Sequence, residues 1–78
     1  MRIMYKYHIS VIHEDGSIHK VVQRNMGSVC PNNCLRRAFA ALGQMIHANS
    51  RSFSLEIKEK VSGIPSFQIT AALPFLED

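Results

Sequence analysis

One stretch with helical periodicity, residues 31–50, lies between two regions that alternate as β-strands do. Its apolar side chains are spaced three and four residues apart, which places them on one face of a helix. They are Leu35, Ala38, Phe39, Leu42, Met45 and Ile46. Pro31 suits the first helical turn, where its missing N–H is not needed, and Asn49 with Ser50 suits the end. We therefore expect a helix from residue 31 to about residue 49.

The segment before this helix predicts a β-hairpin. Residues 5–14 alternate between apolar and polar side chains, and Asp15-Gly16 is a dipeptide typical of two-residue type I′ turns. The register set by such a loop pairs Val11 with Lys20, Ile9 with Val22 and Tyr7 with Arg24. In this register Ile18 and Val22 belong to the apolar face of the hairpin.

Two further strands are predicted after the helix, at residues 53–61 and 67–73, with a break at Gly63 and Pro65. The chain is therefore expected to be a single α+β domain, residues 1–78, with the order ββαββ. It should form a four-stranded, mainly antiparallel sheet with one helix packed on one face, in a strand order that the sequence does not give. The predicted core is Tyr7, Ile9, Val11, Ile18, Val22, Leu35, Phe39, Leu42, Met45, Ile46, Phe53, Leu55, Ile57, Phe67 and Ile69. The predicted polar face of the sheet is Lys6, His8, Ser10, His19, Gln23, Glu56, Lys58, Gln68 and Thr70, with Ile12 and Val21 as its large apolar members.

The composition indicates a folded domain with a mild positive charge. Nine basic and six acidic residues give a net charge of +3, which is compatible with nucleic acid or an acidic protein surface without requiring either. No run approaches the roughly 20 apolar residues needed to cross a bilayer, and no apolar run of secretory length follows the first residues. With only two cysteines as well, we expect a cytoplasmic protein that does not bind membranes.

No residue pattern indicates an enzyme, a metal site or a cofactor. The four histidines include His8 and His19 on one predicted sheet face, but too far apart to share a metal, so surface histidines are the simpler interpretation. Cys30 and Cys34 are separated by three residues, whereas thioredoxin-type motifs have two. A cysteine at the start of a helix can be reactive, but Cys34 can equally be a small buried apolar residue.

The outward side of the predicted helix is the strongest candidate for a binding surface. Arg36, Ala40, Gly43 and His47 follow helical spacing there, so small residues lie between cationic ones. The predicted partner-binding residues are Arg36, Arg37, Gln44, His47 and Arg51, with Lys20 and Arg24 at the sheet edge. An ordinary solvated helix face explains the same pattern.

The plan of the chain also resembles a known group of proteins. The run Tyr7-His8-Ile9-Ser10-Val11, followed by Glu14-Asp15-Gly16 and the alanine-rich helix Ala38-Phe39-Ala40-Ala41-Leu42, is similar to that of some small phage-encoded anti-CRISPR proteins. The resemblance implies a cytoplasmic inhibitor that occludes the surface of a larger protein or ribonucleoprotein. The positive charge argues against the DNA mimicry found among acidic members of that group.

Two alternative functions remain open. The first is a small nucleic-acid-binding domain that places its helix-face arginines on phosphates. The second is a structural or oligomeric subunit, for example a homodimer, in which an exposed strand edge and the tail at Phe75 and Leu76 complete the core of a neighbour.

Overall fold

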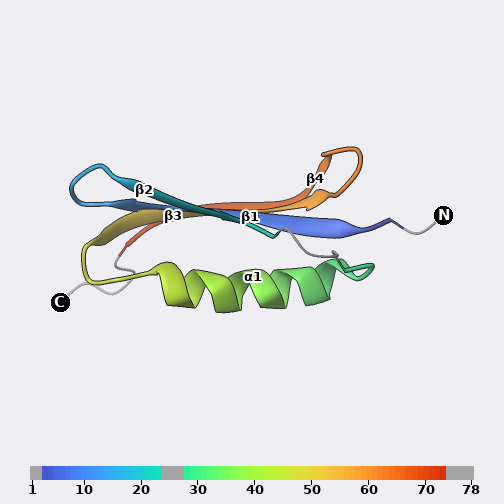
Figure 1. Cartoon of the computed structure of the whole chain (residues 1–78), viewed down its shortest axis with the longest axis horizontal. Coiled ribbons are helices and arrows are strands. Elements are labelled where there is room, and N and C mark those ends of the chain that lie inside the picture. The colour runs from blue at the N-terminus through green and yellow to red at the C-terminus, as the bar shows by residue number, and fades with distance from the viewer. Residues whose placement is uncertain (1–2, 24–27, 74–78) are drawn as a thin grey trace.

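The computed structural model describes residues 3–23 and 28–73, which form one antiparallel sheet and one helix. Along the chain the elements are β1 (Tyr5–His13), β2 (Ile18–Val22), α1 (Pro31–Met45), β3 (Ser50–Glu59) and β4 (Pro65–Ala72). Their order in the sheet is β2-β1-β3-β4, and α1 lies on one face (Figure 1). The predicted α+β class with a single covering helix is confirmed, and the strand order is now known.

The hydrophobic core lies between α1 and the two central strands, β1 and β3. In the antiparallel pairing of these strands, Ile9 lies beside Leu55 and faces the helix. Val11 and Phe53 form the next pair on the same face. The buried apolar side chains are Ile9, Val11, Cys34, Ala38, Leu42, Met45, Phe53, Leu55 and Ile57. Because each large apolar side chain contributes roughly 1.5–3 kcal/mol when buried, this layer is the main source of stability.

The helix ends earlier than the sequence predicts. α1 stops at Met45, because Ile46 has an extended backbone (φ −82°, ψ 128°) while its N–H still donates to the Leu42 carbonyl at 3.1 Å. A turn follows, in which the Ser50 N–H donates to the His47 carbonyl at 3.0 Å. This turn starts β3 at Ser50 instead of Phe53, so the strand spans the whole length of β1.

The hairpin between β1 and β2 has a three-residue loop, not the predicted two-residue loop. The His13 N–H donates to the Ser17 carbonyl at 2.9 Å, and the Gly16 N–H donates back to the His13 carbonyl at 2.9 Å. Gly16 has a φ of 86°, a left-handed conformation that three-residue hairpin loops need at their last position and that glycine adopts without strain. The Asp15 side chain accepts a 2.8 Å hydrogen bond from the Ser17 N–H within this loop.

The longer loop moves the strand register by one residue and exchanges the faces of β2. Ile9 pairs with Val21, and Val11 pairs with His19. Since side chains alternate along a strand, a shift of one residue sends each of them to the other face. Ile18 and Val22, predicted in the core, are therefore 55% and 40% exposed. By the same shift, the predicted positions of His19, Val21 and Gln23 on the polar face are wrong, because these residues lie on the face that carries α1.

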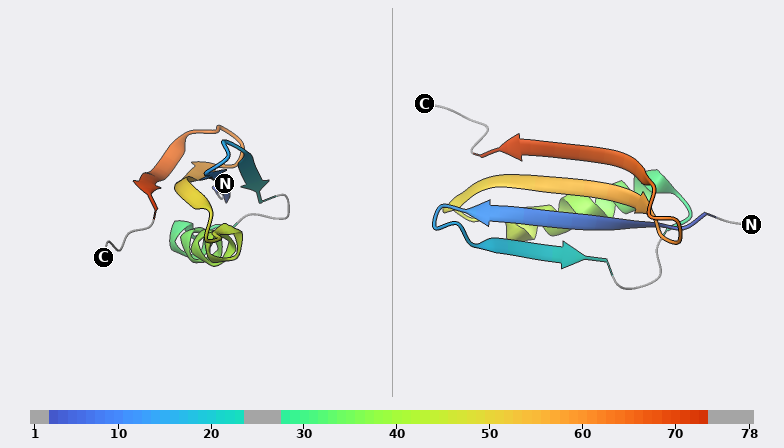
Figure 2. Two further views of the ribbon diagram at one scale, coloured as in Figure 1. Left: turned by 90° about the vertical axis from the view of Figure 1, so that its left-hand side faces the viewer. Right: turned by 90° about the horizontal axis from the view of Figure 1, so that it is seen from above.

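Three more predicted core residues are exposed because α1 covers only part of the sheet. Phe39 is 46% exposed, Phe67 39% and Ile69 36%. A helix about 10 Å wide spans roughly two strands at a spacing of about 4.8 Å. α1 lies under β1 and β3, and the sheet arches over it with β4 on one flank (Figure 2). Tyr7, together with Leu35 and Ile46, is partly buried against the core.

Replacing Leu55 by alanine should destabilise the fold strongly. Leu55 is fully buried at the centre of β3, so Leu55→Ala should lower the free energy of unfolding by about 2–5 kcal/mol through lost burial and a residual cavity. Urea unfolding followed by circular dichroism measures this change. The matched control is Val61→Ala, at a side chain that is 98% exposed, which should change stability by no more than about 0.5 kcal/mol. Equal effects of the two substitutions would contradict the assigned core.

Candidate binding surface

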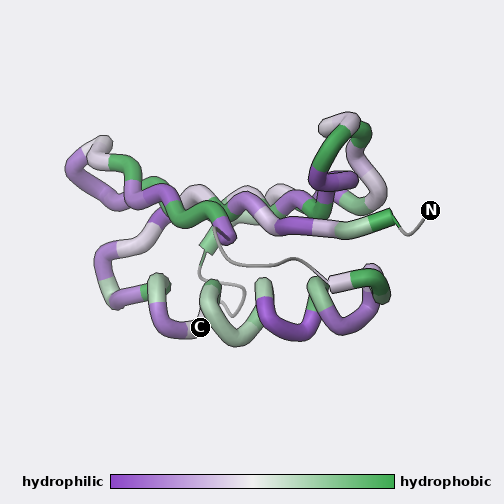
Figure 3. Tube along the Cα trace, turned by 45° about the vertical axis from the view of Figure 1, so that its right-hand side comes forward, coloured by the Kyte–Doolittle hydropathy of each residue, from purple (hydrophilic) through white to green (hydrophobic). Residues whose placement is uncertain are grey.

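The outward side of α1 carries three of the predicted binding residues. Arg36, Arg37 and Gln44 are all exposed, because the helix packs on the sheet with its other side. α1 contains no acidic residue, so no carboxylate of the helix lies near the two guanidinium groups. The arginines lie in the N-terminal half of α1, a helix whose trace alternates between hydrophilic and hydrophobic segments (Figure 3). The outer surface of α1 is therefore electropositive.

The remaining predicted residues are distributed over different parts of the molecule. His47 and Arg51 are exposed near the C-terminal end of α1, in the turn and at the start of β3. Lys20 pairs with Ser10 and lies on the sheet face opposite to α1, so it does not join the helix surface. Arg24 lies outside the described residues. The structure thus groups Arg36, Arg37, Gln44, His47 and Arg51 on the helix side and separates Lys20 from them.

His47 is held against the end of β1 by contacts that the sequence did not reveal. Its ring stacks on that of His13, with centroids 6.3 Å apart and planes inclined by 23°. The Ser50 hydroxyl accepts a 2.8 Å hydrogen bond from the His47 N–H and lies 3.3 Å from Nδ1 of His13. The buried Ser50 hydroxyl thus contacts both the backbone of the turn at His47 and the side chain of His13 at the end of β1. It joins the turn to the sheet. The backbone adds a further link, since the Glu14 N–H donates to the Asn49 carbonyl at 2.8 Å.

Of the two cysteines, Cys34 belongs to the core. It is fully buried, with its Sγ 3.7 Å from Oε1 of Gln23, and burial raises the pKa of its thiol above the ordinary value. A raised pKa keeps the thiol protonated and unreactive at neutral pH. Cys30 precedes α1 as its N-cap residue and is a free thiol, with its N–H donating to the Ser28 hydroxyl at 3.1 Å. The packing interpretation of Cys34 is therefore the correct one.

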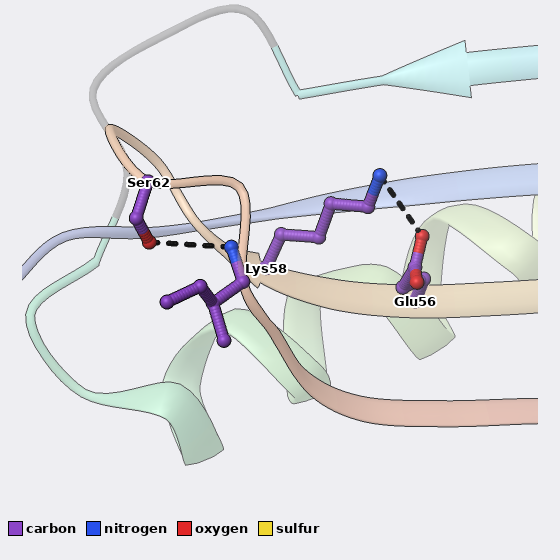
Figure 4. A network of polar contacts seen from close by, with 4 residues as sticks. Glu56, Lys58 and Ser62 are labelled. Atoms are coloured by element: carbon purple, nitrogen blue, oxygen red, sulfur yellow. Dashed lines mark hydrogen bonds and ion pairs between the residues drawn. The ribbon is translucent and has the colours of Figure 1, made fainter.

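The face of the sheet opposite to α1 contains mixed charges. Lys58 and Glu56 form an ion pair at 3.3 Å (Figure 4). Glu56 is also the partner of His8 in the pairing of β1 with β3. Nε2 of His8 is buried and has no hydrogen-bond partner within the described part of the chain. The pKa of His8 is lowered from 6.5, first by burial and then by the charges of Lys58 and Lys6. His8 is therefore neutral at pH 7, and the strands leave Lys6, Lys20 and Lys58 against Glu56 on this face, a net positive charge.

An exposed apolar strip is the surface feature that sequence reasoning missed. Phe39 on α1 and Phe67 with Ile69 on β4 were predicted as core residues, yet each exposes more than a third of its surface. For Phe67 and Ile69, the signal that could have revealed this exposure is the lack of any charged residue from Pro65 to Ala72, which is unusual for a strand at the edge of a sheet.

No protein-family model, curated protein or solved structure matches this chain. Among residues 3–23 and 28–73, no three or more histidine, cysteine or acidic side chains gather in a way that could hold a metal ion. In the same part of the chain, no helix has both the length and the apolar character needed to traverse a bilayer.

The lowered pKa of His8 predicts a pH-dependent contribution to stability. In the unfolded chain His8 takes up a proton near pH 6.5, whereas in the folded protein it does so at lower pH. The unfolded state therefore binds more protons between these two values, and stability falls as the pH drops below about 6.5. His8→Gln should reduce this loss. Urea unfolding at about pH 7.5 and about pH 5, on either side of the ordinary histidine pKa, measures the change.

A titration by NMR tests the cause of that shift. Removing the neighbouring charge with Lys58→Gln should raise the pKa of His8 toward 6.5, because Lys58 opposes its protonation. Lys60→Gln is the matched control, since Lys60 is exposed and is not among the groups that shift His8. A His8 pKa above 6.5 in the unmodified protein would contradict the assigned environment.

Proposed function

We propose that this chain is a non-enzymatic binding protein that occludes the surface of a larger protein or ribonucleoprotein, in the manner of small phage-encoded anti-CRISPR inhibitors. The observation that carries the proposal is the outer side of α1, where Arg36 and Arg37 are exposed on a helix without any acidic residue. Its place of action would be the cytoplasm, where such targets are found.

The separation of the described acidic residues from α1 supports a partner with an acidic surface. The acidic residues within the described ranges lie on the sheet and its loops, at Glu14, Asp15, Glu56 and Glu59. The ion pair of Lys58 with Glu56 is on the sheet face opposite to α1. The positive charge of α1 is therefore available to carboxylates or phosphates of a partner. Arginine suits this role because its planar guanidinium group binds both kinds of anion with two parallel hydrogen bonds.

The placement of the reactive side chains supports a non-enzymatic role. Ser50 has the imidazole of His13 beside it, with Nδ1 3.3 Å from the serine oxygen, but the serine itself is only 7% exposed, and Cys34 is fully enclosed in the core. A nucleophile must be open to its substrate, and neither of these side chains is.

Charge reversal on α1 tests the proposed surface. Arg36→Glu combined with Arg37→Glu should weaken partner binding at least 100-fold, because each guanidinium at the centre of an interface contributes roughly 1.4 kcal/mol or more. The measurements are inhibition of target-DNA cleavage by purified CRISPR effector ribonucleoproteins and binding to them by surface plasmon resonance.

The control for this experiment keeps the change of charge but moves it to another surface. Lys6→Glu combined with Lys60→Glu alters the net charge equally, on residues of β1 and of the connection after β3. This variant should bind and inhibit like the original chain. If the two double variants bind equally well, α1 is not the binding surface.

The second candidate, nucleic-acid binding through the same arginines, has a separate signature. Contacts with phosphates release counterions, so the logarithm of the affinity for single-stranded RNA should fall with the logarithm of salt with a slope of about 0.7 per phosphate neutralised. Two or three arginines on this surface predict a slope of roughly 1.5–2. Absence of any mobility shift with RNA or DNA at low salt would exclude this candidate.

A further inference from the structure

The outer edge of β4 differs from that of the other edge strand. β4 spans eight residues, Pro65–Ala72, without a charged side chain, whereas the shorter β2 carries Lys20. Charged residues at sheet edges prevent unwanted strand pairing, and an uncharged, extended edge is a template for another strand. The register irregularity of β4 lies at its start, opposite Ile57 and Lys58. The remainder of the strand is a regular edge.

The backbone groups at this edge can be assigned from the pairing with β3. The Leu73 N–H donates to the Arg51 carbonyl at 2.7 Å, so Leu73 directs its backbone groups toward β3. Direction alternates along an antiparallel strand, so Ala71, Ile69 and Phe67 also face β3, while Ala72, Thr70 and Gln68 direct their N–H and C=O groups outward. No strand of the described ranges lies beyond β4 to receive them.

The side chains beside this edge form an apolar strip on the face that carries α1. Phe67, Ile69 and Ala71 lie next to the buried Ile57, Leu55 and Phe53 of β3 and point to the same face. α1 runs opposite to β3, and β4 lies on one flank of it (Figures 1 and 2). The buried side of the helix, which includes Ala38 and Leu42, faces the sheet. In a right-handed helix of this direction, Leu35, Phe39 and Ile46 then lie on the flank toward β4. Phe39, Phe67 and Ile69 therefore border one solvent-exposed strip between helix and edge strand.

The sequence of β4 is complementary to itself in an antiparallel arrangement. With a twofold axis at Ile69, the two Ile69 side chains meet, and Phe67 of each copy lies opposite Ala71 of the other. A large side chain thus faces a small one, and all of them are on the helix side. The outward backbone groups of Gln68 then pair with those of Thr70 in the other copy, as an antiparallel ladder requires.

We propose that two copies of this chain associate through β4, with Ile69 at the twofold axis, to form one continuous eight-stranded sheet. A second copy fits this edge because the edge has no charge to offer a charged partner and because one strand supplies both halves of the complementary pattern. Each chain has a net charge of +3, and the arginines of α1 lie outside the paired strands, so repulsion at the contact is small. The dimer does not depend on what α1 binds.

The first test measures the oligomeric state by light scattering and sedimentation. At about 100 μM, a concentration that populates a dimer of micromolar affinity, the chain should have twice the monomer mass of 8.8 kDa. Ile69→Lys places charges at the axis, and Thr70→Pro removes an outward N–H that β3 does not use; both variants should be monomeric. Ile18→Lys is the matched control on the exposed face of β2 and should remain dimeric.

The second test establishes the register and does not depend on the folding of those variants. Non-hydrogen-bonded antiparallel pairs have Cα atoms about 4.5 Å apart, within the range that a disulfide spans. In a Cys30→Ser background, where Cys34 remains buried, Ile69→Cys should form a covalent dimer on oxidation. Thr70→Cys, which points to the other face, should give at least tenfold less of it. Any of three results would overturn the proposal. The unmodified chain could be monomeric, Ile18→Lys could abolish the dimer while Ile69→Lys does not, or Thr70→Cys could cross-link better than Ile69→Cys.

Discussion

The packing of α1 across β1 and β3 is the contact on which the rest of this structure depends. Within residues 3–23 and 28–73, nine buried apolar side chains lie in this layer, and the helix covers the central pair of strands but not the whole sheet. Both edge strands are consequently flanks of the core and not parts of it. The exposure of Phe39, Phe67 and Ile69 has this single cause, because the width of one helix cannot bury the inner faces of four strands.

This geometry gives the molecule two surfaces of opposite character. The outer side of α1 is electropositive, as the proposed acidic partner requires, whereas the edge of β4 is uncharged, as the proposed pairing with a second copy requires. The twofold axis of the proposed dimer is perpendicular to the sheet, so both helices would lie on the same face. The two basic surfaces would then point the same way, and a target with repeated acidic sites could engage both at once.

The fold class and the helix-side part of the candidate surface were predictable because they follow from side-chain periodicity. Leu42 and Met45 lie in the core, and Arg36 and Arg37 point away from it, as their helical positions predict. The hairpin register was not predictable, because Asp15-Gly16 fits a two-residue loop and also a three-residue loop with Gly16 at its left-handed position. The two-residue loop would pair Lys20 with Val11 on the helix side of the sheet. The three-residue loop pairs it with Ser10 on the opposite face.

The sequence by itself determined which elements form and which of their side chains are apolar, since helix and strand periods are local properties of the chain. Only the tertiary structure decided which apolar residues are buried. Phe67 and Ile69 alternate along β4 just as Leu55 and Ile57 do along β3, yet one pair is partly exposed and the other is enclosed. The difference is whether α1 covers the strand. This depends on strand order and helix placement and not on any local pattern.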